Sequence, residues 1–68
     1  MIDYSEIFDH EYETKDVVYI VNTKQAGLYI KHFVPLVDLF WSSGTLVFVF
    51  NRAESKTAYD LWCKHQLV

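Results

Sequence analysis

The stretch LVDLFWSSGTLVFVF, residues 36–50, decides the fold of this chain. Two runs rich in Val, Leu, Phe and Trp flank a short polar link, residues 42–45. Within that link Gly44 can adopt the positive φ that a tight turn requires. The pattern predicts a β-hairpin in which Ser43 and Gly44 are the two loop residues.

This loop fixes the cross-strand register of the hairpin. One face then pairs Trp41 with Leu46, Leu39 with Phe48, and Val37 with Phe50. The other face carries Leu36, Asp38, Phe40, Val47 and Val49. Because both faces are mostly apolar and a lone two-stranded ribbon is marginal in water, we expect helices and a second copy of the chain to cover them.

The size of the chain supports the expectation of a partner. Its 68 residues form one small domain, which buries only about 60% of its unfolded surface. Cys63 is the only cysteine, so no internal disulfide can form, and no zinc-ligand cluster is present. A composition of 51% hydrophobic and 18% aromatic residues therefore predicts self-association, with a homodimer as the expected state.

Charge and hydropathy narrow the possible environments. The first ten residues lack a basic region followed by an apolar core, and no run approaches the roughly eighteen apolar residues of a membrane helix. We therefore expect a cytoplasmic protein without a membrane partner. A net charge of −3 disfavours binding to nucleic-acid phosphates through bulk electrostatics.

Residues 1–16 are expected to form an acidic N-terminal arm. They hold six of the nine acidic residues, mixed with aromatic and aliphatic side chains. The arm would either dock its aromatic residues on the sheet or stay mobile until a partner binds. Five carboxylates are its candidate partner-binding groups: Asp3, Glu6, Asp9, Glu11 and Glu13. The alternative is an acidic tail that only aids solubility.

Residues 17–68 are expected to form a single α+β domain. The run VVYIV, residues 17–21, predicts a strand, and the hairpin supplies strands at 36–41 and 45–50. Asn22 with Gln25, and Asn51 with Glu54, have the spacing of capping boxes. Helices are therefore predicted at 23–33 and 52–66. Helix formation over residues 17–27, which would give an α–β–β–α order, is disfavoured by four β-branched residues in five positions.

The predicted element order is β-α-β-β-α. A right-handed crossover makes the first two strands parallel, and the third is antiparallel to the second, either at the edge or between them. Both helices would pack on one face of this three-stranded sheet. The helix-free face and the neighbouring edge form the predicted interaction surface, with Val18, Ile20, Leu36, Asp38, Phe40, Val47 and Val49.

Four segments, NTKQAGLYIKH (22–32), PLVDLF (35–40), LVFVFNR (46–52) and LWCKHQL (61–67), resemble a loose group of small uncharacterised proteins. These are encoded by phages, other mobile elements and genomes of Gram-positive bacteria. The resemblance implies a phage or mobile-element accessory protein and brings no catalytic residues with it. That group commonly places Gly directly after the first helix, where this chain has Phe33, so the helix exit is expected to differ.

The sequence contains no convincing set of catalytic or metal-ligating residues. Cys63 with His65 or His32 would need a group that orients them, and Cys63 and His65 diverge on a helix. The three histidines also lack metal-ligand spacing. We expect no enzymatic activity, no catalytic residues, no metal and no cofactor.

Asp38 is the most anomalous polar residue, since Val37 and Leu39 flank it in a strand. The favoured interpretation is a solvated charge at a sheet edge, which discourages aggregation. The alternative buries it at a dimer contact, where it would need Lys31 or Arg52 as a partner.

The expected function is protein–protein interaction, with self-association through the sheet and a further protein of the host or phage as a possible second partner. One alternative is an acidic nucleic-acid mimic that inhibits a nucleic-acid-binding protein or nuclease of the host through the N-terminal arm. A weaker alternative is single-strand nucleic-acid binding, with aromatic stacking beside basic residues. It would use Tyr29, Phe40, Trp41, Lys24, Lys31 and Arg52.

Overall fold

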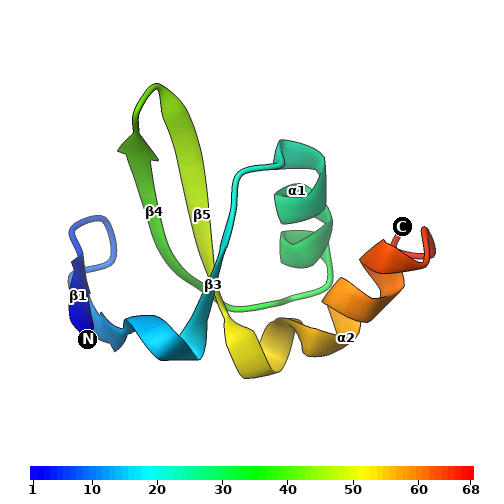
Figure 1. Ribbon diagram of the computed structural model, residues 1–68, viewed down its shortest axis with the longest axis horizontal. Helices are drawn as coiled ribbons and strands as arrows, with labels where there is room; N and C mark the ends of the chain where they lie inside the picture. The colour runs from blue at the N-terminus through cyan, green and yellow to red at the C-terminus, as the bar shows by residue number, and fades with distance from the viewer.

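The computed structural model describes all residues, 1–68, as an α+β chain with two helices and two antiparallel sheets (Figure 1). The smaller sheet contains β1 (Ile2–Ser5) and β2 (His10–Glu13). A short 3₁₀ helix, η1 (Thr14–Asp16), leads into the larger sheet. That sheet contains β3 (Val17–Ile20), β4 (Leu36–Ser42) and β5 (Thr45–Asn51). The helices are α1 (Thr23–Lys31) and α2 (Arg52–Cys63).

Strand β5 lies at the centre of the larger sheet. The order is β3-β5-β4, and β5 pairs antiparallel with both neighbours (Figure 1). Strands β3 and β4 therefore run in the same direction without touching, and the last strand has inserted between them. The predicted α+β class is confirmed, but the first sixteen residues, which were expected to form an arm, contain a second sheet.

The central hairpin forms around the predicted loop. Ser43 and Gly44 both have positive φ, 51° and 79°, as a type I′ turn requires. Trp41 pairs with Leu46 and Leu39 with Phe48. Below them a β-bulge between Leu36 and Asp38 shifts the register by one residue.

The bulge changes which side chains face the helices. Leu36, and not Val37, stands opposite Phe50, so the predicted pairing of Val37 with Phe50 is wrong. Leu36 joins Val18 and Ile20 against the cluster that the helices build on the sheet. Their assignment to the helix-free face is therefore also wrong. The buried members of this first cluster are Ala26, Tyr29, Val34, Phe50, Ala58 and Leu67.

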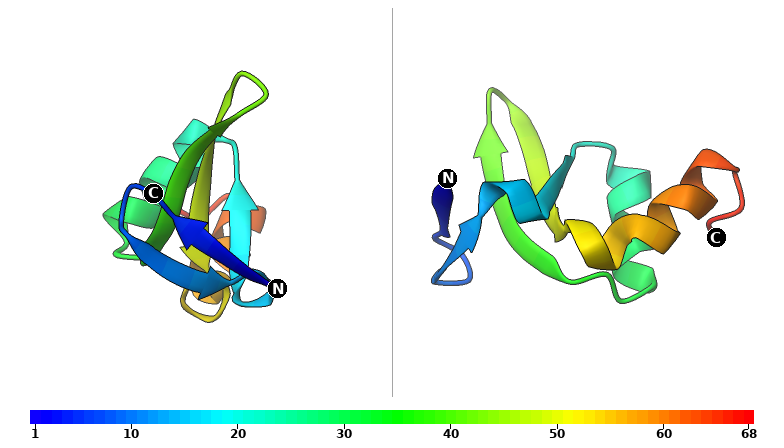
Figure 2. Two further views of the ribbon diagram at one scale, coloured as in Figure 1. Left: turned by 90° about the vertical axis from the view of Figure 1, so that its left-hand side faces the viewer. Right: turned by 60° about the horizontal axis from the view of Figure 1, so that its bottom comes forward.

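The opposite face of the sheet is covered by the N-terminal strands. Tyr12 from β2 packs with Val17, Val47 and Val49 in a second cluster, and Phe40 packs against it. Val49 is fully buried and Val47 is 8% exposed. The left view of Figure 2 shows β1 and β2 in front of the sheet and the helices behind it. The expectation of an open apolar face for a second copy is therefore wrong, because the chain's own first residues cover it.

Both helices begin as predicted and end earlier. The Asn22 side chain accepts a hydrogen bond from the Gln25 backbone N–H at 3.0 Å, and the Asn51 side chain accepts one from Glu54 at 2.9 Å. The Gln25 side chain does not return to Asn22. It donates to the Tyr29 hydroxyl at 3.0 Å inside the protein. Neither helix is both long and apolar enough to cross a lipid bilayer.

Candidate binding surface

The acidic hairpin, residues 2–13, is the most distinctive surface feature of the molecule. Its strands pair from Ile2 with Glu13 to Ser5 with His10. The loop between them is closed by the Asp9 backbone N–H, which donates to the Ser5 carbonyl at 2.8 Å. The buried Ser5 hydroxyl accepts from the Phe8 N–H at 3.1 Å, so the loop has a defined shape.

Side-chain contacts hold this hairpin against β4. The Tyr12 hydroxyl donates to Asp38 Oδ2 at 2.8 Å in a buried contact. His10 Nε2 lies 2.8 Å from the Val37 carbonyl oxygen. These contacts join the hairpin to residues more than twenty positions further along the chain, so it is docked and not a free arm.

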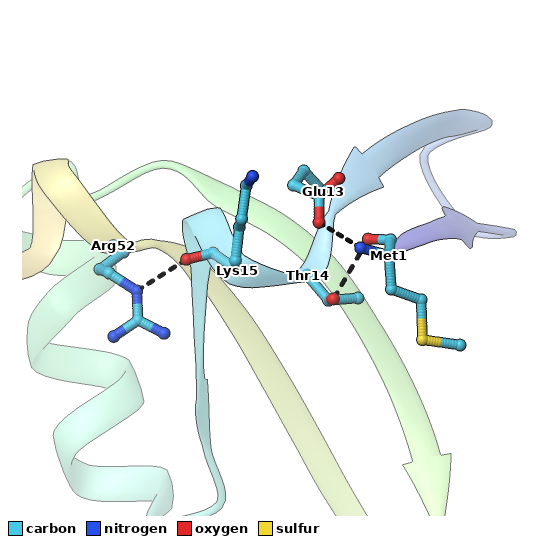
Figure 3. A network of polar contacts seen from close by, with 5 residues as sticks. All are labelled: Met1, Glu13, Thr14, Lys15 and Arg52. Atoms are coloured by element: carbon cyan, nitrogen blue, oxygen red, sulfur yellow. Dashed lines mark hydrogen bonds and ion pairs between the residues drawn. The ribbon is translucent and has the colours of Figure 1, made fainter.

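A second set of polar contacts fixes the start and the end of the hairpin segment (Figure 3). The Met1 ammonium group pairs with Glu13 Oε1 at 2.5 Å, and the Thr14 hydroxyl donates to the Met1 carbonyl at 3.1 Å. Beyond the hairpin, Arg52 Nε donates to the Lys15 carbonyl at 3.0 Å. Helix α2 is thereby tied to the segment that leads out of the hairpin.

Asp38 is buried inside the single chain, so the expectation of a solvated edge charge is wrong. Only 4% of the residue is exposed. Oδ2 accepts from Tyr12, and Oδ1 accepts from the Leu39 backbone N–H at 2.8 Å. Its partner is therefore neither Lys31 nor Arg52. Burial, and after it the hydrogen bond to Asp38, raises the pKa of Tyr12 well above the ordinary range of a phenol.

Charge is strongly segregated between the hairpin and the rest of the chain. Residues 1–13 contain five acidic side chains and no Lys or Arg. Residues 14–68 contain all six basic residues and four acids, a net charge of +2. Glu13 is half-buried, whereas the other four hairpin acids are exposed: Asp3, Glu6, Asp9 and Glu11.

Apolar side chains share this acidic surface. Ile2 and Ile7 are each 57% exposed, and Tyr4 and Phe8 are about half exposed. The Tyr4 hydroxyl donates to Asp9, and that hydrogen bond raises the pKa of Tyr4. A surface that combines carboxylates with exposed aromatic and aliphatic groups suits a partner that is basic and partly apolar.

Between the hairpin and β4 lies a groove of about 600 Å³. One wall comes from the hairpin, with Tyr4, Glu6 and Ile7, and the other from β4, with Phe40 and Trp41. Trp41 is 69% exposed at the end of that strand. The groove has no signal in the sequence, because the docking of the hairpin creates it.

The other residues singled out from the sequence are not gathered into a site. Cys63 is exposed near the end of α2, where its proximity raises the pKa of Tyr59. His32 Nε2 lies 2.7 Å from the Val68 carbonyl oxygen, so a backbone contact holds this ring. No three His, Cys, Asp or Glu side chains are grouped closely enough to hold a metal ion.

The aromatic residues considered for base stacking are also separated. Tyr29 of α1 is completely buried, and the centroid of its ring lies 5.1 Å from that of Phe50 in an edge-on arrangement. It therefore cannot stack on a base. Phe40 is half-buried beside the hairpin. Of the three, only Trp41 is well exposed.

Comparisons of the chain with protein-family models, with curated proteins and with solved structures returned no match.

Proposed function

We propose that this protein acts by binding and not by catalysis, and that it presents the acidic hairpin to a basic surface of another protein. The observation that carries the proposal is the segregation of charge, with five carboxylates and no Lys or Arg in residues 1–13. A nucleic-acid-binding protein offers a surface of the complementary kind. The hairpin would then occupy the site where phosphates bind.

The anchoring of the hairpin supports this proposal. The Tyr12–Asp38 hydrogen bond and the apolar packing on Val47 and Val49 fix its position before a partner arrives. A pre-ordered surface loses less conformational entropy on association than a flexible tail does. Ile7 and Phe8 at the loop add apolar contact area that a solubility tail would not need.

Self-association through the helix-free face is the weaker candidate. Val47 and Val49, which were expected to meet a second copy, are covered by the hairpin. A dimer would therefore have to use a sheet edge or displace the hairpin. The proposal gives priority to a basic partner for this reason.

Two variants with the same formal net charge test the proposal. The hairpin variant carries Asp3→Asn, Glu6→Gln and Glu11→Gln. The control variant carries Asp16→Asn, Glu54→Gln and Asp60→Asn, which replace three exposed acids outside the hairpin. The probe is a fluorescent decalysine peptide, and its anisotropy is measured at several NaCl concentrations, with duplex DNA added as a competitor for the peptide.

The native chain should bind decalysine with an affinity that falls as salt rises. The hairpin variant should bind about tenfold more weakly, and the control should stay within about threefold of the native chain. Equal weakening of both variants would show that net charge alone governs binding. That result, or no binding by the native chain, would overturn the proposal.

A further inference from the structure

The two edges of the larger sheet both leave backbone groups open, and they differ in the side chains that surround these groups. The Ser42–Thr45 pair closes a two-residue loop, and such a pair exchanges backbone hydrogen bonds. Because hydrogen-bonded pairs alternate along an antiparallel ladder, Leu39 and Trp41 direct their backbone groups away from β5, toward the free edge of β4. The same alternation directs Val17 and Tyr19 toward the free edge of β3.

The first half of the β4 edge is already occupied. The Val37 carbonyl contacts His10, and the Leu39 N–H donates to Asp38. The Leu39 carbonyl and both backbone groups of Trp41 have no such partner. This open segment lies next to the groove, which Leu39 and Trp41 help to line. On β3 the corresponding Val17 carbonyl accepts from Arg52 Nη2 at 2.9 Å, which leaves the Val17 N–H and both backbone groups of Tyr19 directed toward that edge.

The side chains around the open β4 segment define what would fit it. Asp3 and Glu6 on the hairpin line the groove together with Ile7, Phe40 and Trp41. An extended chain presents side chains alternately to its two sides, so one set can meet carboxylates while the other meets apolar groups. The complementary segment therefore alternates Lys or Arg with apolar residues.

A second copy of this chain does not supply such a segment. None of the five strands contains a Lys or an Arg. Pairing β4 with its own copy would also bring two acidic hairpins together, on chains that each carry a net charge of −3. Charge complementarity thus favours a segment of a different protein.

We infer that the β4 edge from Leu39 to Trp41 binds an extended, basic and apolar segment of a partner protein, which adds to the larger sheet as a fourth strand beside the acidic hairpin. This inference rests on the proposed function and specifies how the partner is held. Backbone pairing to Trp41 would provide affinity, and the carboxylates of Asp3 and Glu6 would select basic side chains.

Two soluble nonapeptides of equal charge serve as probes. The first, KVKVKVKVK, can extend along the edge. The second, KVKPKPKVK, carries the same lysines, but its prolines remove backbone donors and interrupt pairing. Binding is measured by anisotropy, and hydrogen exchange of the Trp41 amide is followed by NMR. The native chain should prefer the first peptide by about tenfold, and that peptide should slow exchange at Trp41 by at least about tenfold.

Edge variants locate the contact. Trp41→Pro removes the outward donor of β4, and Tyr19→Pro makes the same change on the β3 edge. Proline is tolerated at edge positions whose N–H faces solvent, so both chains should keep their NMR dispersion. Trp41→Pro should abolish the preference for KVKVKVKVK, and Tyr19→Pro should retain it. Trp41→Ala, which keeps the N–H, should lose affinity and still discriminate between the peptides.

The outcomes separate this inference from the proposed function. If the native chain binds both peptides equally and Trp41 exchange is unchanged, the edge contact is refuted while binding by the acidic hairpin stands. The same conclusion follows if Tyr19→Pro alone removes the preference. If neither peptide binds, both the edge contact and the proposed function fail. If the hairpin variant binds KVKVKVKVK more weakly and no longer prefers it to KVKPKPKVK, the result supports both the edge contact and the proposed function.

Discussion

Phe33 holds a backbone conformation that is unfavourable for a bulky residue. Its φ is 63°, and its side chain is 91% exposed. The Phe33 N–H donates to the Ile30 carbonyl and the Val34 N–H donates to the Tyr29 carbonyl, both at 3.0 Å, which is the hydrogen bonding of a Schellman motif. Glycine usually occupies this position after a helix, so the exit from α1 keeps the usual geometry with an unusual residue.

Phe33→Gly should therefore stabilise the protein. Relief of the left-handed strain is worth about 1–2 kcal/mol, and the added flexibility of the unfolded chain offsets part of it, so we expect a net gain of about 1 kcal/mol. Urea unfolding followed by circular dichroism measures the change. Phe33→Ala keeps a Cβ and should show little of this gain. A loss of stability in the glycine variant would show that the Phe33 ring makes a stabilising contact.

Tyr12 links folding stability to pH. Burial and the hydrogen bond to Asp38 keep its pKa above the ordinary value of 10.0 in the folded protein. The unfolded chain loses the phenolic proton near pH 10, so above that pH it binds fewer protons than the folded chain. The free energy of unfolding must then fall as pH rises through about 10, whereas the contribution is complete below that pH.

The Tyr12→Phe variant tests this linkage. At neutral pH it should lose about 1–3 kcal/mol, because buried Asp38 loses its hydroxyl donor. The difference in unfolding free energy between the native chain and the variant should shrink between about pH 9 and about pH 11. Tyr4→Phe, at an exposed phenol, serves as the control and should change stability less. A difference that is constant with pH would contradict the linkage.

At the scale of elements, the sequence predicted the central hairpin and both helices well, since each has strong local signals. The turn at Ser43 and Gly44 needed positive φ, and the two asparagine caps marked the helix starts. The bulge beside Val37 has no comparable signal in the sequence. The order of apolar and polar residues in LVDLF, residues 36–40, is compatible with a regular strand and with a strand that contains one extra residue. That single residue reversed the expected orientation of Leu36.

The acidic hairpin was missed for a different reason. IDYS alternates apolar and polar residues over only four positions, and HEYE has a single apolar residue, so both are weak evidence for strands. Tyr4, Ile7 and Phe8 have instead the i, i+3, i+4 spacing of a helical turn, although they lie in and beside a β-hairpin. What stabilises the hairpin is its docking through Tyr12 and His10, and contacts over more than twenty residues are not visible in local patterns.

Val47→Glu tests how tightly the hairpin element covers the sheet. Val47 packs with Tyr12, so a carboxylate there would be buried without a partner, and we expect a loss of about 3 kcal/mol or more. Thr45→Glu, on the same strand and exposed, should stay within about 0.5 kcal/mol of the native chain. Thermal unfolding measures both. A stable Val47→Glu variant would show that the hairpin detaches readily.

At the scale of the whole molecule, the larger sheet lies between two small clusters of buried residues, six on the helix side and four on the hairpin side. Two helices do not cover a sheet that is apolar on both faces, as its sequence indicates. The expected cover was a second copy of the chain, whereas the first thirteen residues supply it within one chain (Figure 2).

Sedimentation equilibrium should therefore find a monomer of 8.1 kDa at concentrations of about 10 μM. The expected reason is that the apolar face is covered and that neighbouring chains repel each other through their acidic hairpins. The same experiment at raised salt is the control, since screening weakens this repulsion. A dimer at low salt would contradict the monomeric state and favour pairing through a sheet edge.

The separation of charge between residues 1–13 and the remainder of the chain places an excess of negative charge at the end of the molecule where the hairpin lies (Figure 1). In the field of a cationic partner such a molecule turns before it collides, so encounters begin with the hairpin facing the partner. Added salt should then slow association much more than it hastens dissociation. The hairpin would thus guide the approach as well as form the contact.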